Sequence, residues 1–222
     1  MDYLRLRRTR LMLGSFLLFA LLISVFPRID IQISSLFFDG TSFWHVWWQK
    51  LLKDALGYLL GMAVLAVVLI YVCNRLLNRN ICGVDGRRVV FVLLVGIVGA
   101  GLIVNVALKD HLGRARPRHI EEFGGTKQFT PLFVPSRECR VNCSFSSGDA
   151  AGAFLSLALA KVLTRRRRYY VAALGFGALV SLARVSAGAH FLSDTVVSFF
   201  IMLIVTDVFW HYIVREPMNA GD

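Results

Sequence analysis

The sequence predicts an all-α polytopic membrane protein with six transmembrane helices. The 222-residue chain is 56% hydrophobic and has a mean hydropathy of +0.62, although its net charge is +11. Its apolar residues gather in six runs, and its arginines gather between those runs. Apolar runs of about 20 residues are typical of helices that cross a bilayer, because the backbone polar groups must be satisfied inside lipid.

The apolar runs appear in regular order along the chain. They are Leu11–Phe26, Ala55–Val72, Val89–Leu108, Ala150–Leu163, Tyr169–Ala189 and Thr195–Val214. The first and fourth are short for a span, and we expect the fourth to extend upstream through Ser144–Asp149, which places that polar stretch at a membrane face. The first run follows a basic stretch but no small-residue cleavage site follows it, so we expect a retained span and not a signal peptide. We expect residues 1–222 to form a single domain, because the sequence contains no evident internal repeat or linker.

The positions of the arginines predict the orientation. The clusters are Arg5, Arg7, Arg8 and Arg10; Arg75, Arg79, Arg87 and Arg88; Arg165, Arg166, Arg167 and Arg168; and Arg215. With six spans all of them fall on one side, which the positive-inside rule makes cytoplasmic together with both termini. Trp44, Trp47 and Trp48 then lie at the outer interface. Because the basic residues alternate with spans and do not line one face, we expect the bilayer and no nucleic acid as partner; the oligomeric state is not predicted.

Two polar segments remain on the outer side, the loop 109–147 and the connection around His190. Lys109, Arg116 and Arg184 lie there against the positive-inside bias, which indicates an anionic partner. Asp194 follows His190 by one helical turn, so its carboxylate is expected to accept the imidazole N–H and hold the ring. Ionisable groups at the start of a span are costly enough to indicate a function.

Ser147 and Gly148 open the fourth span, where backbone N–H donors and the positive end of the helix dipole favour an anion. Together these groups are typical of phosphoryl transfer through a phosphohistidine: cations neutralise the phosphoryl oxygens, a histidine attacks phosphorus and an acid protonates the leaving alkoxide. We expect no metal and no cofactor, because no metal-ligand cluster is present. A transporter is the alternative from another class, but among the span centres only Asn105 and, toward the inner end, Asp207 are notable polar residues.

Three motifs resemble the signature of the type-2 phosphatidic acid phosphatase superfamily. They are Lys-x6-Arg-Pro at 109–117, Ser-Gly at 147–148 and Arg-x5-His-x3-Asp at 184–194. The first and third match in full spacing, and the resemblance covers the chain from the third to the sixth span. It implies that phosphate is bound by Lys109, Arg116, Arg184, Ser147 and Gly148, that His190 is the nucleophile, and that Asp194 orients it.

The second motif departs from the family's pattern. The family usually has Pro-Ser-Gly-His, with the histidine as acid and base, whereas here Ser146 and Asp149 take the first and last positions. An aspartate is ordinarily ionised near neutral pH and is then no proton donor. His111 and His119 are alternative donors, Asp149 could contact only substrate hydroxyls, and a catalytically inactive lipid-binding relative is a further alternative.

Longer stretches resemble the bacterial lipid A phosphatases, most closely the lipid A 4′-phosphatases, in which an acidic residue replaces that histidine. They are Lys-Asp-His-x-Gly-Arg-x-Arg-Pro and Cys-x3-Cys-Ser-Phe-x-x-Gly-Asp-Ala. The resemblance implies a metal-independent phosphatase of the bacterial inner membrane that acts on lipid A at the periplasmic face. Alternatives are a lipid A 1-phosphatase, a phosphatidylglycerophosphate or phosphatidate phosphatase, an undecaprenyl pyrophosphate phosphatase, and a phosphotransferase.

Cys139 and Cys143 lie in the outer loop, which such a location exposes to the oxidising periplasm. We therefore predict a disulfide between them that fixes the loop beside Ser147, Gly148 and Asp149. Two free thiols are the alternative.

Overall fold

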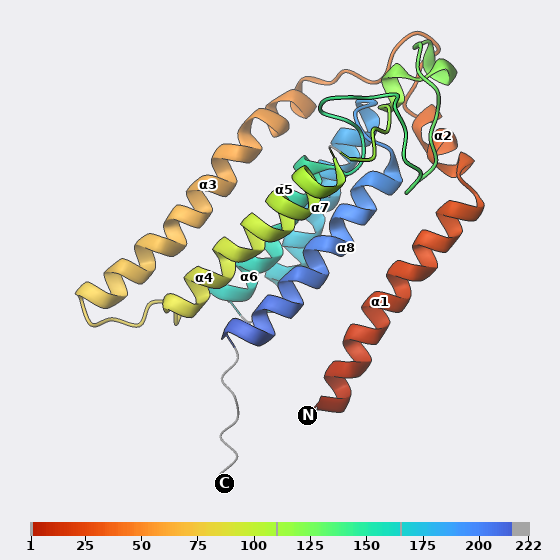
Figure 1. The fold of residues 1–222 in the computed structure, drawn as a ribbon. Helices are drawn as coiled ribbons and strands as arrows, with labels where there is room; N and C mark the ends of the chain where they lie inside the picture. Colours follow the sequence, from red (N-terminus) through yellow and green to blue (C-terminus); the bar gives the residue numbers. More distant parts are fainter. Residues whose placement is uncertain (1, 110, 165, 215–222) are drawn as a thin grey trace.

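The computed structural model describes residues 2–109, 111–164 and 166–214, which form a bundle of helices that lie side by side (Figure 1). The long elements are α1 (Asp2–Val25), α3 (Trp47–Leu76), α4 (Gly86–Leu94) continued by the π-helix η1 (Val95–Leu108), α7 (Arg167–Ser186), and α8 (Leu192–Phe209) continued by the π-helix η4 (Trp210–Val214). The short elements are α2 (Arg28–Ser35), the 3-10 helices η2 (Pro117–His119) and η3 (Glu121–Phe123), α5 (Gly148–Phe154) and α6 (Ser156–Leu163). No β-strand occurs in the described parts of the chain.

The all-α membrane architecture agrees with the prediction, but the count of six spans is not confirmed. Four helices of the described residues are long and apolar enough to cross a membrane: α3, α4 with η1, α7, and α8 with η4. The pair of α1 and α2 is a fifth candidate, bent by 86° between its two helices.

The predicted fourth span forms the two short helices α5 and α6, which meet at Leu155. The polar stretch before it is not helical: Ser144 and Ser146 are fully buried in a loop, and helix begins only at Gly148. The central helix therefore starts inside the bundle and is too short to be a full span. Small residues let its neighbours approach closely, and a Cβ at Gly177 of α7 would collide with the Phe154 ring.

Pro27 explains the bend between α1 and α2. Proline disfavours helical backbone in the residue before it, and Phe26 is accordingly the break between the two helices. The new direction turns α2 across the end of the bundle (Figure 1). The buried Asp30 of this helix enters the candidate site.

The two ends of the bundle differ in structure. The end with α2, η2 and η3 carries the long loop between η1 and α5, whereas the α3–α4 and α6–α7 connections lie at the opposite end (Figure 1). The described basic residues of those connections are Arg75, Arg79, Arg87, Arg88, Arg166, Arg167 and Arg168. Arg165 and Arg215 lie outside the described residues, as does Asp110. Trp44 and Trp47, which precede and begin α3, are 52% and 76% exposed.

Candidate active site

The residues predicted to form a site come together at the end of the bundle that carries the long loop. Lys109 follows η1, Arg116 precedes η2, Gly148 opens α5, Arg184 lies in the last turn of α7, and His190 connects α7 to α8. Ser147, Asp149 and Asp194 flank these positions on α5 and α8. Three segments that are distant in sequence, 109–116, 147–149 and 184–194, thus contribute to one site, and His190 is only 1% exposed within it.

A backbone carbonyl, and not the predicted carboxylate, holds the imidazole of His190. Its Nδ1 lies 2.7 Å from the carbonyl oxygen of Ser144, whereas the Asp194 carboxylate lies 3.9 Å away, beyond hydrogen-bond distance. Because a carbonyl only accepts hydrogen bonds, Nδ1 carries the proton and the lone pair of the neutral ring lies on Nε2. Asp194 acts on the ring through Ser144, whose hydroxyl donates to this carboxylate at 2.5 Å.

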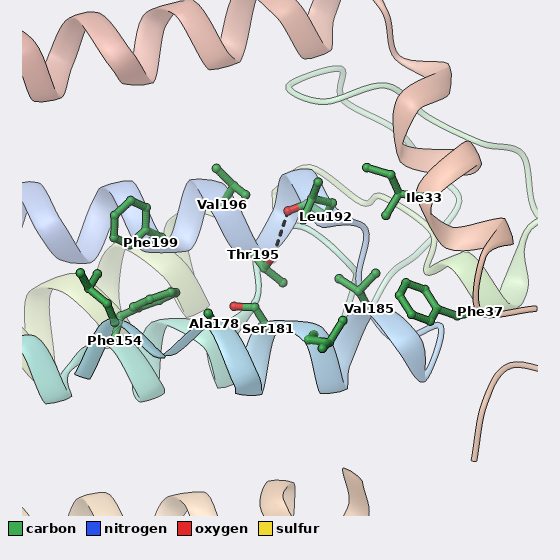
Figure 2. A pocket seen from close by; sticks show the side chains of 12 residues that line it. Ile33, Phe37, Phe154, Ala178, Ser181, Val185, Leu192, Thr195, Val196 and Phe199 are labelled. Carbon is green, nitrogen blue, oxygen red and sulfur yellow. Dashed lines mark hydrogen bonds between the residues drawn. The ribbon is translucent and has the colours of Figure 1, made fainter. Parts of the chain in front are cut away.

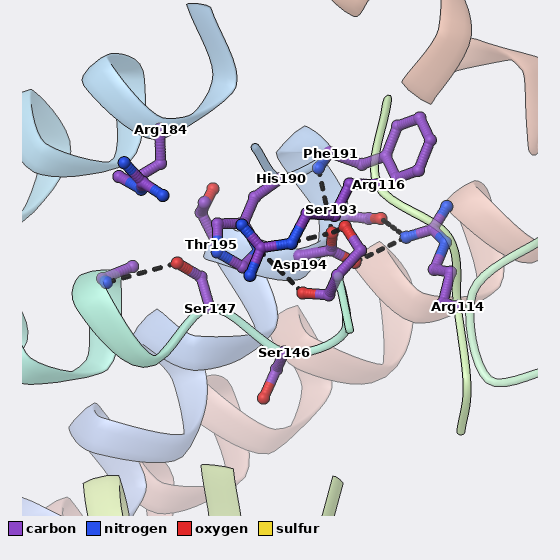
Figure 3. A network of polar contacts seen from close by, with 12 residues as sticks. Arg114, Arg116, Ser146, Ser147, Arg184, His190, Phe191, Ser193, Asp194 and Thr195 are labelled. Carbon is purple, nitrogen blue, oxygen red and sulfur yellow. Dashed lines mark hydrogen bonds and ion pairs between the residues drawn. The ribbon is translucent and has the colours of Figure 1, made fainter. Parts of the chain in front are cut away.

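A buried ion network supports Asp194 from behind (Figure 3). Arg114 donates to the carboxylates of Asp194 at 2.6 Å and Asp30 at 2.9 Å. Ser193 joins the network, since its hydroxyl accepts from Arg114 at 2.9 Å and donates to Asp30. These four side chains are all fully or almost fully buried. The network ties α2, the long loop and α8 together directly behind the histidine.

Sequence reasoning missed both Arg114 and Asp30. Arg114 lies inside the first motif, at a position to which the signature assigns no residue type. Asp30 follows the proline-induced bend, and a lone carboxylate beside an apolar span was the only signal that it is buried against a cation.

Arg116 is held by the loop opposite it. Its guanidinium donates to the carbonyl oxygen and to the side-chain Oδ1 of Asn142, at 2.6–3.0 Å. Burial and the neighbouring cations Arg118 and Arg184 lower the pKa of Arg116 to about 10, so it remains charged at neutral pH. Its orientation is therefore fixed before any substrate binds.

Arg184 keeps hydrogen-bonding capacity. Its Nε lies 2.9 Å from the Asp149 carboxylate, yet this buried Nε has no directed hydrogen bond within the described residues. The contact is an ion pair in which the N–H does not point at its partner. Figure 3 shows Arg184 and Ser147 on one side of His190 and Arg114 on the other.

The cations act together on His190. Burial, then Arg116, Arg184 and Lys109, lower the pKa of His190 well below its ordinary value. A protonated imidazole is disfavoured among these positive charges. The resting site therefore combines a neutral imidazole with a surplus of positive charge, which suits an anionic ligand.

The start of α5 fits closely against η1. The Ser147 hydroxyl accepts from the N–H of Ala150 and caps the helix. A Cβ at Gly148 would collide with Oδ1 of Asn105, whose amide donates to the carbonyl of Ala100. Glycine at position 148 thus permits the close approach of α5 to the π-helix η1, which ends just before Lys109.

The model of the PAP2 superfamily matches residues 89–217 of the sequence. This match spans more than half of the chain and includes each of the three motifs. The chain belongs to the PAP2 superfamily. It is 32% identical over 202 residues to the lipid A 4′-phosphatase of Francisella tularensis subsp. novicida, covering 86% of this chain and 89% of that protein. It is 31% identical over 227 residues to the lipid A 4′-phosphatase of Rhizobium etli, covering 90% and 88%.

A solved structure has the same fold as this PAP2 chain. The crystal structure of a PAP2-type phosphatidylglycerolphosphate phosphatase from Bacillus subtilis superposes with a TM-score of 0.62. The two sequences are 19% identical, and the match covers 95% of this chain and 98% of the other.

The PAP2 chain offers three candidate groups for proton transfer. Asp149, in the first turn of α5, pairs with Arg184 inside the site. His111 is exposed and its Nδ1 lies 3.2 Å from the carbonyl of Val106, and His119 is exposed beside Arg118. Of the three, Asp149 directly contacts Arg184, a residue that is predicted to bind phosphate. No group of three or more potential metal-binding side chains occurs among the residues that the structure describes.

The loop that contacts Arg116 is closed by a covalent bond. The sulfur atoms of Cys139 and Cys143 are bonded, with Cα atoms 5.5 Å apart. Asn142 lies inside this short ring, and the ring ends next to Ser144, which binds His190. Cys73 and Cys82, by contrast, are free and exposed.

Proposed function

We propose that this PAP2 protein hydrolyses a phosphate monoester of lipid A, preferentially the 4′-phosphate, at the outer face of a bacterial inner membrane. The neutral, buried imidazole of His190 among three cations carries the proposal. The two lipid A 4′-phosphatases that match most of the chain support the choice of substrate. The arginine-rich end of the bundle would face the cytoplasm, with both termini, and the site would face the periplasm.

In the first step, Nε2 of His190 attacks phosphorus and the bond from phosphorus to the sugar oxygen breaks. Lys109, Arg116 and Arg184 neutralise the phosphoryl oxygens. The incoming phosphate competes with Asp149 for Arg184, so that this carboxyl group is released next to the departing oxygen. The Asp149 carboxylate takes the proton that the phosphate monoester carries as a monoanion and passes it to that oxygen, and the dephosphorylated lipid leaves.

In the second step, water hydrolyses the phosphohistidine. Asp149, now a carboxylate, accepts the proton from the attacking water, and the bond between nitrogen and phosphorus breaks. Inorganic phosphate leaves and the neutral ring is restored. The Ser144 carbonyl keeps its hydrogen bond from Nδ1 in both steps, so that Nε2 alone reacts.

An apolar groove of about 430 Å³ supports a lipid as substrate (Figure 2). It runs between α7 and α8 below α2, and its residues Val185 and Leu192 lie close in sequence to Arg184 and His190. The hydroxyls of Ser181 and Thr195 donate to carbonyls of their own helices, at 2.8 Å each, which leaves apolar surface toward the groove. We infer that an acyl chain of the substrate lies here while its phosphate reaches the site.

A trapping experiment tests the mechanism. Protein incubated with lipid A labelled at its phosphates is denatured in alkali, which preserves phosphohistidine, and bound label is counted. Wild-type protein denatured during turnover should hold label, and His190→Ala should hold none. Label that persists without His190 would refute the nucleophile. Phosphate release from phosphatidylglycerophosphate or undecaprenyl pyrophosphate, but not from lipid A, would refute the substrate.

Removing an anionic group from lipid A would reduce the negative charge of the cell surface. Cationic antimicrobial peptides bind such surfaces electrostatically, so the proposed activity would weaken their binding.

A further inference from the structure

A second cavity shares Arg184 with the candidate active site. This cavity of about 360 Å³, the basic recess, is lined by the side chains of Lys50, Lys53, Arg118 and Arg184 together with His45 and Trp47. No aspartate or glutamate is among its described lining residues. The nearest acidic residue in sequence, Asp54, lies outside the lining. The recess is therefore positively charged and continuous with the phosphate site through one arginine.

Specific contacts hold the walls of the basic recess together. The Gln49 amide donates to the Ser186 hydroxyl at 2.8 Å, and this buried hydrogen bond fixes the first turn of α3 to the end of α7. The N–H of Arg118 donates to the carbonyl of Gly188 at 3.1 Å, which fixes η2 to the same connection. Gly188 has a φ of +61°, and a Cβ there would collide with the buried Phe43 ring. These contacts thus hold three separate segments of the chain around the recess.

The charges of the basic recess favour the binding of an anion. Lys50 and Lys53 lie three residues apart on α3 and so project from one side of that helix. Arg118 and Arg184 come from other segments to the same recess, and the Asp149 carboxylate that pairs with Arg184 at 2.9 Å is not among the residues that line it. Such a group of cations focuses a positive potential and raises the local concentration of anions. Anchoring of α3 in lipid headgroups would explain the lysines but not the convergence of both arginines on them.

We propose that the basic recess binds a second anionic group of the same lipid, a phosphate or carboxylate other than the one hydrolysed. The inference rests on the proposed function and narrows its substrate class to lipids with at least two anionic groups. Arg184 lies between the two anions and contacts both. A lipid with a single phosphate would leave the recess empty and bind more weakly.

Steady-state kinetics with two lipids tests this assignment. The substrates are lipid A with both phosphates and the same lipid without its 1-phosphate, in neutral detergent and without other lipids. For Lys50→Gln with Lys53→Gln we expect KM to rise about tenfold for the diphosphorylated lipid, because charge-assisted contacts are lost. The kcat for this lipid, and both constants for the monophosphorylated lipid, should change less than about twofold.

The matched control is Arg137→Gln, which removes a positive charge from the outer loop away from the recess. It should leave the KM for both lipids unchanged. An equal rise in KM for both lipids would overturn the inference, because the lysines would then attract lipids or micelles without regard to a second anion. An unchanged KM for the diphosphorylated lipid would also overturn it. Inorganic phosphate, or phosphatidylglycerol, could instead raise the KM of the wild-type protein but not that of the two-lysine variant. That result would assign the recess to free phosphate or to neighbouring headgroups.

A binding measurement separates failure of this inference from failure of the proposed function. Native mass spectrometry of His190→Ala in detergent gives the Kd for each lipid without turnover. The two lysine changes in this background should weaken binding of the diphosphorylated lipid about tenfold and spare the other. If wild-type protein turns over no lipid A, the proposed function fails, while this result still decides whether the recess recognises a second anion. Equal Kd values of the His190→Ala protein for the two lipids would refute the recognition of a second anion.

Discussion

Replacing Arg114 with methionine should destabilise the protein strongly. Arg114 is 1% exposed, and its guanidinium donates to Asp30, Asp194, the Ser193 hydroxyl and the carbonyl of Thr130, at 2.6–2.9 Å. Removing one partner of a buried ion pair costs about 3–5 kcal/mol, because the other charge stays buried without compensation. Here two carboxylates would lose their common cation, so we expect a loss in the upper part of that range, about 5 kcal/mol.

The free energy of unfolding can be measured by titration of detergent-solubilised protein with dodecyl sulfate. Arg137→Met, the same chemical change at an exposed arginine, should change it by less than about 0.5 kcal/mol. Adding Asp30→Asn to Arg114→Met should restore about 1–3 kcal/mol, because only one carboxylate then lacks a cation. The reasoning would be refuted by a loss below about 1 kcal/mol in Arg114→Met, or by a double variant no more stable than the single one.

Three further predictions concern the site itself. The pKa of His190 lies well below 6.5, so the nucleophile is neutral and active above that pKa. We expect kcat/KM to decline on the acid side only below pH 6.5, as His190 becomes protonated; a decline that begins above pH 6.5 and depends on His190 would contradict this. Gly148→Ala should cost about 1–3 kcal/mol of stability through its collision with Asn105, and Gly148→Ala with Asn105→Ala should recover part of it; equal losses would argue against the contact. Alkylation of unreduced protein should modify neither Cys139 nor Cys143, and reduction should raise KM by loosening the loop; modification without reductant would disprove the disulfide.

The sequence was most informative for the site residues that stand at a fixed spacing within a motif. Lys109, Arg116, Arg184 and His190 were predicted from motif spacing, and the structure brings their segments to one end of the bundle. Hydropathy located the third, fifth and sixth runs within about three residues of their helices, whereas α1 and α3 begin at Asp2 and Trp47, well before the runs that start at Leu11 and Ala55. An apolar run marks only the part of a helix that lies in lipid. It failed for the fourth run, since hydropathy does not reveal that buried serines form a loop inside the bundle.

Contacts between distant segments could not be predicted. The pairing of Asp30 with Arg114 joins residues 84 positions apart, and nothing local in either segment indicates the other. The hydrogen bond from His190 to the Ser144 carbonyl is equally hidden, because a backbone acceptor leaves no mark in the sequence. A carboxylate one turn after a histidine made the direct pair with Asp194 the natural expectation. In the structure this carboxylate instead accepts hydrogen bonds from Arg114, from the Ser144 hydroxyl and from the N–H of Phe191.

Mass spectrometry of lipid A after incubation with purified protein in detergent tests the proposed activity most directly. We expect wild-type protein to remove one phosphate, located at the 4′ position by fragmentation, and His190→Ala to remove none. Lipid A that keeps both phosphates in the presence of folded wild-type protein, or equal phosphate loss with His190→Ala, would contradict the proposal.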